Sequence, residues 1–300
     1  MTVARNVRPV AKTSGNRRKI VAKSQLATDY EKNGFAVIEN AIAASDLDSI
    51  KAAAQRIVES FDAGKHQSVF STKHQDKDRD KYFIDSGEAV HCFLEEDALT
   101  GSGELNRPKD RAINKIGHAM HDRVPEFTRF CRLPIFADTF RDLGFQSPEL
   151  WQTMYIFKQP KIGGEVRWHQ DGSYLISETP GVIGCWIAIE NATKENGCLW
   201  VQPGGHRSPL REIYEVTDSE PTGELRDLDS TPWPNESQAF AVEVPAGSIV
   251  LFSDHMPHYS SQNFSDNSRQ AFTLHVAEHG SHWSERNWLQ RPNLSPFLLT

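Results

Sequence analysis

From Trp151 onward the sequence consists of short apolar segments separated by turns, and this pattern restricts the fold more than any other feature. The segments are rich in the β-branched and aromatic residues that favour strands, and glycine- or proline-containing turns such as Gly163-Gly164 and Asn196-Gly197 lie between them. Such a series of short strands is typical of a sandwich or barrel. We predict strands at 151–158, 182–189, 199–202, 240–244, 248–252 and 270–277.

The part of the chain before Trp151 has a helical pattern. We predict a helix at 24–33, a strand at 34–38, and a helix from an N-cap at Ser45 to Phe61, with Asp48 in the capping-box position. The window 111–143 predicts further helices with breaks near Pro125 and Pro134. Helices followed by many strands indicate the α+β class.

Two segments stand apart from this pattern. Residues 1–24 are basic, with no acidic residue before Asp29; we interpret them as a flexible tail, and a mitochondrial transit peptide is the alternative. Residues 25–300 then form one domain. Within it, 208–236 is acidic and rich in turn residues, which indicates either a lid over a pocket or an insertion without a role.

Charge and composition exclude several classes of protein. A net charge of −7 and a pI near 6.0 argue against a nucleic-acid-binding protein. No apolar run is long enough to span a membrane, and the N-terminal segment lacks the apolar core of a secretory signal. The four cysteines form no C-x-x-C pair, so we expect no thiolate zinc site and an intracellular, cytoplasmic location, with mitochondrial targeting as the alternative.

The pair His169 and Asp171, followed by His258, indicates a metal site. On a strand, residues two apart point the same way, and a distant second histidine completes one face of a metal ion. Two imidazoles and one carboxylate are the ligand set of non-haem Fe(II) oxygenases. The chain has 12 His and 40 Asp plus Glu, so an accidental match on a solvated turn is the alternative.

Arg269 gives independent support for this metal site. It lies eleven residues after His258, and the turn-rich stretch between them predicts a hairpin that brings both side chains into one cavity. A guanidinium offers a planar fork to a carboxylate, and 2-oxoglutarate carries such a group opposite the keto acid that chelates iron. An exposed arginine on an edge strand is the alternative.

At this point the residues resemble the phytanoyl-CoA dioxygenase family, and more closely its domain-containing protein 1 type. The likeness runs from about residue 28 to the end and rests on ordered blocks. These blocks are His169-Gln170-Asp171, Glu195-Asn196-Gly197-Cys198-Leu199-Trp200, Pro203-Gly204-Gly205-His206, His258, Arg269, Ile113-Asn114-Lys115-Ile116-Gly117-His118-Ala119 and Met154-Tyr155-Ile156-Phe157-Lys158-Gln159-Pro160.

The resemblance implies a double-stranded β-helix core (a cupin-like jelly roll) with flanking N-terminal helices. It also implies Fe(II), 2-oxoglutarate and O2 as cofactor and cosubstrates, with Lys115, Met154 and Trp186 in contact with 2-oxoglutarate. From the residues alone, these three are a surface lysine and two core residues. One departure is in Pro203-Gly204-Gly205-His206, where the family more often has Ser directly before the His; another is a one-residue shortening between Asp171 and Trp186.

We therefore expect an oxygenase that hydroxylates a small hydrophobic or amphipathic substrate and releases succinate and CO2. Asp171 favours oxygen insertion, because related halogenases have a small residue at this ligand position. Three alternatives stay open: the same oxidant used for desaturation, epimerisation or ring closure; a non-catalytic ligand-binding member of the fold; and a cupin-like metal enzyme without 2-oxoglutarate. Aromatic residues either line the pocket or belong to the core, namely Trp168, Tyr174, Trp200 and Trp283. The sequence gives no indication of the oligomeric state.

Overall fold

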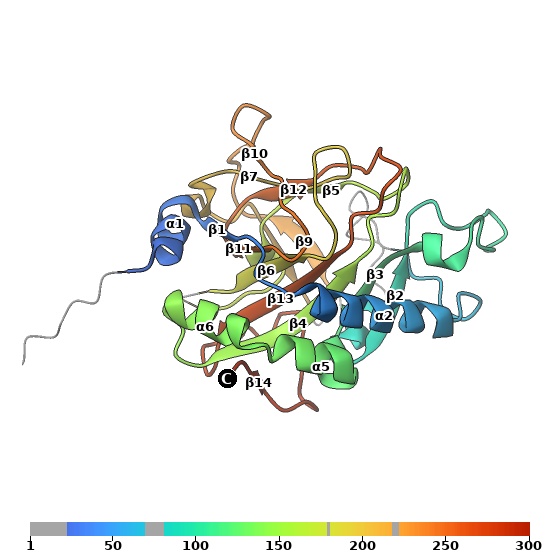
Figure 1. The fold of residues 1–300 in the computed structure, drawn as a ribbon, viewed down its shortest axis with the longest axis horizontal. Helices are drawn as coiled ribbons and strands as arrows, with labels where there is room; N and C mark the ends of the chain where they lie inside the picture. Colours follow the sequence, from blue (N-terminus) through green and yellow to red (C-terminus); the bar gives the residue numbers. More distant parts are fainter. Residues whose placement is uncertain (1–22, 70–80, 179–180, 218–221) are drawn as a thin grey trace, which may run out of the picture.

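Two antiparallel sheets face each other in the computed structural model, and helices cover the outer side of the larger sheet (Figure 1). The structure describes residues 23–69, 81–178, 181–217 and 222–300. Residues 1–22 of the predicted basic tail therefore lie outside the described residues. The arrangement is the predicted α+β jelly roll, although the two sheets are not closed into a barrel.

The larger sheet contains most of the strands. Its order is β1 (Phe35–Ile38), β11 (Ile249–Ser253), β6 (Ile183–Ala188), β13 (Ala271–Glu278), β4 (Pro148–Ile156), β3 (Ile113–His118) and β2 (Val90–Leu94), and β14 (Phe297–Leu298) pairs with β4. The smaller sheet has the order β10 (Phe240–Val242), β7 (Leu199–Val201), β12 (His258–Ser260) and β5 (Val166–His169). A separate pair consists of β8 (Glu212–Glu215) and β9 (Glu224–Asp227).

Side chains alternate across the larger sheet, and this separates two cores. In β6, Cys185 and Ile187 pack into the cluster that includes the helices, whereas Trp186 lies in the cluster between the sheets. In β11, Leu251 and Phe252 divide in the same way. This is the period of two that a strand imposes, and it directs every second residue of the larger sheet toward the smaller one.

The helices are short except for α2. They are α1 (Gln25–Asn33), α2 (Ala44–Ser60), α3 (Lys81–Asp85), α4 (Met120–Arg123), α5 (Pro125–Cys131) and α6 (Pro134–Asp142), with 3-10 turns η1 (Ser86–Glu88), η2 (Lys109–Arg111), η3 (Asp171–Ser173) and η4 (Gly205–Arg207). Figure 1 shows α2, α5 and α6 along one face of the larger sheet. Pro125 and Pro134 open α5 and α6, where a missing N–H costs nothing.

All six strands predicted after Trp151 are present, with shifted ends. The helix at 24–33 is also confirmed, with Ser24 as its N-cap accepting from the Ala27 N–H. Two other predictions were wrong. The N-cap of α2 is Ala43 and makes no side-chain bond, so Ser45 has no capping role. Residues 113–118 form β3, because pairing with β2 and β4 on both sides outweighs local helical preference.

The segment 208–236 contains regular structure that the sequence did not predict. The strands β8 and β9 pair antiparallel from Glu212–Asp227 to Glu215–Glu224, and Tyr214 is buried beside Tyr174. Residues 218–221 lie outside the described part. The strand pair anchors the base of this segment, and its role as a lid stays a prediction.

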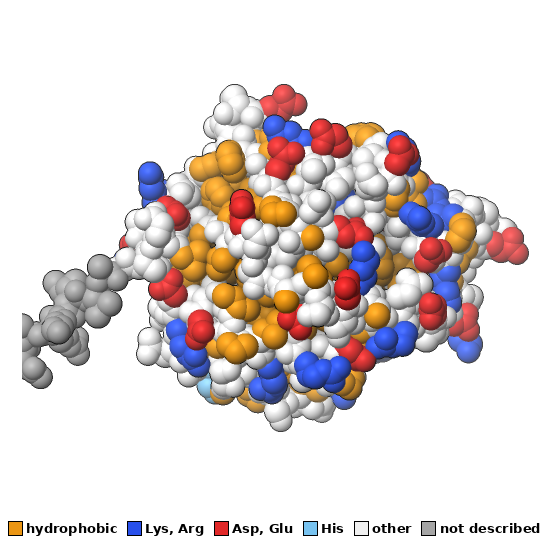
Figure 2. Space-filling view, in the orientation of Figure 1, with side chains coloured by type: hydrophobic (Ala, Val, Ile, Leu, Met, Phe, Trp, Pro, Cys, Tyr) orange, Lys and Arg blue, Asp and Glu red, His pale blue; other side chains and the backbone are white. Residues whose placement is uncertain are grey.

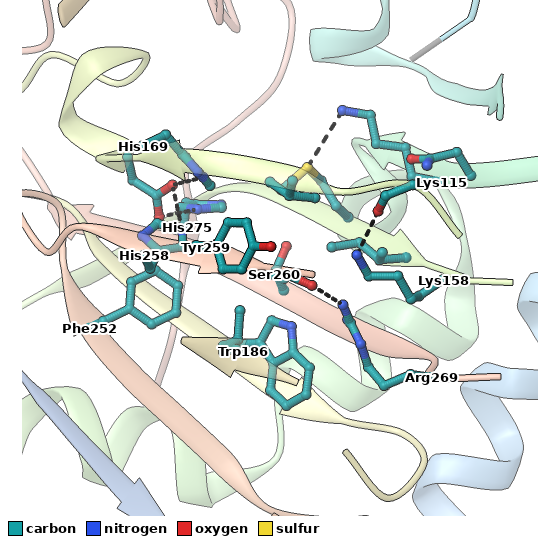
Figure 3. Close-up of a pocket in the computed structure, with 18 residues that line it drawn as sticks. Lys115, Lys158, His169, Trp186, Phe252, His258, Tyr259, Ser260, Arg269 and His275 are labelled. Atoms are coloured by element: carbon teal, nitrogen blue, oxygen red, sulfur yellow. Dashed lines mark hydrogen bonds and ion pairs between the residues drawn. The ribbon is translucent and has the colours of Figure 1, made fainter. Parts of the chain in front are cut away.

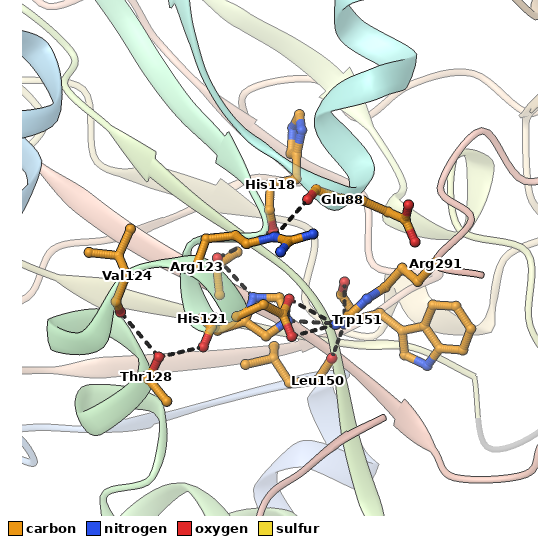
Figure 4. A network of polar contacts seen from close by, with 11 residues as sticks. Glu88, His118, His121, Arg123, Val124, Thr128, Leu150, Trp151 and Arg291 are labelled. Carbon is orange, nitrogen blue, oxygen red and sulfur yellow. Dashed lines mark hydrogen bonds and ion pairs between the residues drawn. The ribbon is translucent and has the colours of Figure 1, made fainter. Parts of the chain in front are cut away.

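A buried polar network attaches the C-terminal segment to the larger sheet (Figure 4). The guanidinium of Arg291 donates to both carboxylate oxygens of Asp122 at 2.8 Å and to the carbonyls of Leu150 and Trp151. It also lies 3.0 Å from Nε2 of His121. Burial, and secondarily the charge of Arg291, lowers the pKa of His121, so this imidazole is neutral.

The surface is mixed in charge. On the face shown in Figure 2, Lys and Arg side chains are interspersed with Asp and Glu over the whole area. All four cysteines are buried and free. Among the described residues, no helix has the length and apolarity that crossing a membrane requires.

Candidate metal centre

The pairing of two short strands creates the site. His169 ends β5 and His258 begins β12, and the two are direct cross-strand partners with ring centroids 4.0 Å apart. Asp171 opens η3 immediately after β5. Its Oδ1 lies 3.7 Å from Nε2 of His169 and 3.6 Å from Nε2 of His258 (Figure 3). Within the described part of the chain, this is the group of histidine and carboxylate donors whose ligand atoms all lie within 4.8 Å of one another.

One detail of the expected geometry was wrong. Asp171 does not share a strand with His169, since β5 stops at His169 and the chain turns. The turn is fixed by Gln170, whose buried side-chain amide donates to the carbonyls of Pro209 and His255. The carboxylate therefore reaches the histidines from a turn.

Both histidines present the same nitrogen to the site. Nδ1 of His169 lies 2.9 Å from the carbonyl of Arg167, and Nδ1 of His258 lies 3.0 Å from that of Met256. A carbonyl only accepts, so each Nδ1 carries the proton and each Nε2 has a free lone pair. Two lone pairs and a carboxylate oxygen thus converge on one point.

The protonation states suit a cation. Burial, and then the neighbouring His258, lowers the pKa of His169 to about 3, which keeps this imidazole neutral. Burial alone raises the pKa of Asp171, but His275, His258 and His169 outweigh it, so the net pKa lies well below its usual value. Neutral imidazoles and an ionised carboxylate are the forms that bind a divalent metal, so the donor set fits Fe(II).

A cavity of ≈130 Å³ between the two sheets connects this centre to Arg269 (Figure 3). Its walls are mainly apolar and come from both sheets. The lining residues are Asn114, Lys115, Met154, Ile156, Lys158, Gly164, Val166, His169, Asp171, Trp186, Leu199, Phe252, His258, Tyr259, Ser260, Arg269, Thr273 and His275.

Arg269 is buried and incompletely paired. Its Nε donates to the carbonyl of Gly197 at 3.0 Å and its Nη2 to Oγ of Ser260 at 3.0 Å. Nη1 is buried without a hydrogen-bond partner. Burial lowers the pKa of Arg269 to about 10, so it stays charged at neutral pH. An unpaired, charged donor inside a cavity is costly unless an anion accepts from it, so this end fits a carboxylate.

The route by which Arg269 reaches the cavity differs from the predicted hairpin. His258 belongs to β12 in the smaller sheet, whereas Arg269 lies just before β13 in the larger one. The two residues meet because the sheets face each other, and Arg269 bonds to Ser260 across that space.

The three further positions named from the resemblance all line the cavity. Lys115 lies on β3, with Nζ 4.0 Å from Sδ of Met154 and 5.3 Å from the centre of the Phe93 ring. The Trp186 ring lies 5.4 Å from the Arg269 guanidinium, and its Nε1 is buried without a partner. Contact with 2-oxoglutarate stays a prediction for these residues.

Sequence reasoning missed several polar residues of the cavity, including Ser260, His275 and Lys158. Strand alternation could have indicated the first two, because Ser260 lies two residues after His258 and His275 six residues after Arg269. Lys158 carried no such signal. Its buried Nζ donates to the carbonyls of Gly164 and Ser261, and burial, then Arg269, lowers its pKa. None of the four aromatic residues proposed as pocket candidates lines the cavity, whereas Tyr259 does.

Comparisons with known proteins agree with this geometry. The family model for phytanoyl-CoA dioxygenase (PhyH) matches residues 30–271. A phytanoyl-CoA dioxygenase domain-containing protein 1 homolog of Caenorhabditis briggsae is 40% identical over 274 residues, 89% of this chain and 95% of the relative. The domain-containing protein 1 of Bos taurus is 37% identical over 92% of this chain and 97% of its own length. In fold, the chain is similar to the epimerase SnoN in complex with Fe3+, alpha ketoglutarate and nogalamycin RO (TM-score 0.61, 15% identity, 90% of each chain covered).

Proposed function

Because the chain belongs to the phytanoyl-CoA dioxygenase family of 2-oxoglutarate-dependent non-haem iron oxygenases, we propose that it oxidises a small organic substrate with Fe(II), 2-oxoglutarate and O2. The products are the hydroxylated substrate, succinate and CO2. The observation that carries the proposal is one cavity with three convergent metal donors and a buried guanidinium whose Nη1 has no hydrogen-bond partner.

Each end of the cavity has a separate task. His169, Asp171 and His258 hold the metal, and Arg269 with Ser260 receives the distal carboxylate of 2-oxoglutarate. Bound Fe(II) supplies the Lewis acid for the keto acid and the electrons that activate O2. Lys115, Met154 and Trp186 complete the walls around the cosubstrate. Phe252 and Leu199 exclude water from the space between the sheets.

Hydroxylation is the reaction we favour. Asp171 fills the carboxylate position, which leaves no place for a halide among the protein-derived ligands. Epimerisation is the second candidate, since the similar fold of SnoN belongs to an epimerase. The mainly apolar wall, from Ile156, Val166 and Leu199, favours a hydrophobic or amphipathic substrate.

Calorimetry tests the cofactor assignment without knowledge of the substrate. 2-Oxoglutarate is titrated into the protein with and without Mn(II), which replaces Fe(II) without reacting with O2. We expect binding that depends on Mn(II), because the keto acid needs the metal. Absence of 2-oxoglutarate binding under both conditions would favour a non-catalytic ligand-binding protein over an oxygenase.

A further inference from the structure

The outer oxygen of Asp171 has a partner of its own. Nε2 of His275 lies 2.9 Å from Oδ2 of Asp171, whereas Oδ1 faces the two metal-binding histidines. His275 is 3% exposed and lies on β13, in the larger sheet. It is not itself one of the three convergent donors.

The proton positions follow from the carboxylate outward. An ionised carboxylate only accepts, so Nε2 of His275 must carry a proton and donate it. In the neutral imidazole Nδ1 is then an acceptor. The side-chain amide of Gln152 lies 3.0 Å from Nδ1 through its Nε2, which donates. Gln152 therefore donates to His275, and His275 donates to Asp171.

Regular pairing of β4 with β13 puts Gln152 opposite His275, and a β-bulge follows directly after this pair. In the pairing of β4 with β13, His275 is opposite Gln152 but Val276 is opposite Leu150, so Trp151 is an extra residue on β4. Leu150 packs in the helix-side core, whereas Gln152 faces His275. Residues two apart on a regular strand would share a face, and the bulge reverses this.

We propose that His275, oriented by Gln152, is a positioning residue that occupies the outer oxygen of Asp171 and so limits Asp171 to one metal-binding oxygen. A metal held by His169, His258 and one oxygen of Asp171 would keep positions open for the keto acid and O2. A carboxylate free to bind through both oxygens would take one of them. The inference rests on the proposed function.

Three variants test the proposal. His275→Leu removes the donor, His275→Gln keeps an amide N–H at about the place of Nε2, and Gln152→Leu leaves His275 without its orienting partner. His279→Leu is the matched control, because His279 also contacts a carboxylate, Glu149 Oε2 at 2.8 Å, but lies beyond the end of β13 and outside the cavity.

The primary readout is the dissociation constant of Mn(II), with 2-oxoglutarate affinity of the Mn(II)-loaded protein as the second. Loss of a partner of a metal ligand typically weakens metal binding about 10–100-fold. We expect that loss for His275→Leu, a smaller loss in the same direction for Gln152→Leu, near-native binding for His275→Gln and native binding for His279→Leu. Visible absorption of the Co(II)-loaded protein reports the coordination number, which should change in His275→Leu and, to a smaller extent, in Gln152→Leu, but not in His275→Gln or His279→Leu.

Several outcomes would overturn the proposal. Native Mn(II) affinity and a native Co(II) spectrum in His275→Leu would do so, and so would equal losses in His275→Leu and His279→Leu. If circular dichroism shows that His275→Leu is unfolded, Gln152→Leu and His275→Gln decide on the same readouts. If the native protein binds no Mn(II), the proposed function fails and this inference with it. If the native protein binds Mn(II) and the His275 and Gln152 variants bind it equally well, the proposed function stands and this inference alone fails.

Discussion

His169 and His258 face each other across the antiparallel pairing of β5 and β12, with ring centroids 4.0 Å apart. The metal-binding pair therefore exists only when these two strands are paired in that register. β12 is held on its other side by β7, where His258 is opposite Val201. Since a slip of one residue would turn every side chain to the other face, the smaller sheet fixes the metal centre.

Replacing Gly197 should weaken the binding of 2-oxoglutarate. Gly197 has φ +83°, and an added Cβ would lie 2.7 Å from the Ser261 carbonyl and 3.2 Å from Cε of Lys158. Its own carbonyl accepts from Nε of Arg269. Gly197→Ala should cost about 1–3 kcal/mol of stability and raise the dissociation constant of 2-oxoglutarate, measured by calorimetry with Mn(II).

Gly144→Ala is the control for that variant. Gly144 also has a positive φ, +99°, but no atom lies within 4 Å of an added Cβ. It should lose stability through backbone strain alone and keep native 2-oxoglutarate affinity. Equal affinities in the two variants would contradict the role of the Gly197 carbonyl in holding Arg269.

Arg269→Lys should reduce affinity for 2-oxoglutarate but not for 2-oxobutyrate, which lacks the distal carboxylate. Lysine keeps the charge and loses the fork that bonds to Gly197 and Ser260. A hydrogen bond to a charged group contributes about 1.5–3 kcal/mol, which corresponds to roughly 10–150-fold in the dissociation constant. Calorimetry of both keto acids with the Mn(II)-loaded protein measures the difference. An equal loss of affinity for 2-oxoglutarate and 2-oxobutyrate would mean that Arg269 does not bind the distal carboxylate.

The metal-free protein should lose stability as the pH falls below 6.5. The pKa of His169 is about 3 in the folded protein and 6.5 without burial, so between these values the unfolded chain takes up a proton that the folded protein refuses. Unfolding is then favoured by roughly 1 kcal/mol for each pH unit. The depressed pKa of Asp171 acts in the same direction at still lower pH.

Melting temperatures in the presence of a chelator measure this effect. Between pH 7.5 and pH 5, the melting temperature of the native protein should fall further than that of His169→Asn, which has no imidazole to protonate at this position. The same pH dependence in both proteins would show that His169 is not held in its neutral form by the fold.

Arg291→Met should destabilise the fold and leave the metal centre unchanged. The Arg291 side chain is 5% exposed, and its guanidinium bonds to Asp122 and to two carbonyls (Figure 4). Removal of one partner of a buried ion pair costs about 3–5 kcal/mol. Urea unfolding should show that loss, and the double variant with Asp122→Asn should lose less than the sum of the single changes. A loss below about 1 kcal/mol would contradict this account of the network, since exposed pairs contribute that little.

The candidate metal donors could be named from the sequence because part of their signal is local: His169 and Asp171 lie two apart. For Arg269 the turn-rich stretch after His258 led to the right cavity through a wrong expectation, since the two residues lie in facing sheets and not in one hairpin. The long strands were predictable for a similar reason, since apolar runs bounded by turns mark β6, β11 and β13. The pairing that brings His169 to His258 was not predictable, because β5 and β12 have only four and three residues and no periodicity of their own.

Long-range pairing explains the remaining errors. Residues 113–118 became a strand because β2 and β4 lie on either side of them. Gln152 lies opposite His275 because of the register of β4 against β13, a feature that depends on the partner strand. The orientation of Lys158, buried with two carbonyl partners, depends likewise on loops distant in the sequence.

Succinate formation from 2-oxoglutarate is the most direct test of the central claim. The native protein and Asp171→Ala are incubated with Fe(II), 2-oxoglutarate, O2 and a panel of small substrates, because these oxygenases also turn over slowly without substrate. We predict succinate from the native protein alone, and acceleration by a panel compound would identify the substrate class. Equal succinate formation by Asp171→Ala would contradict the metal centre proposed at His169, Asp171 and His258.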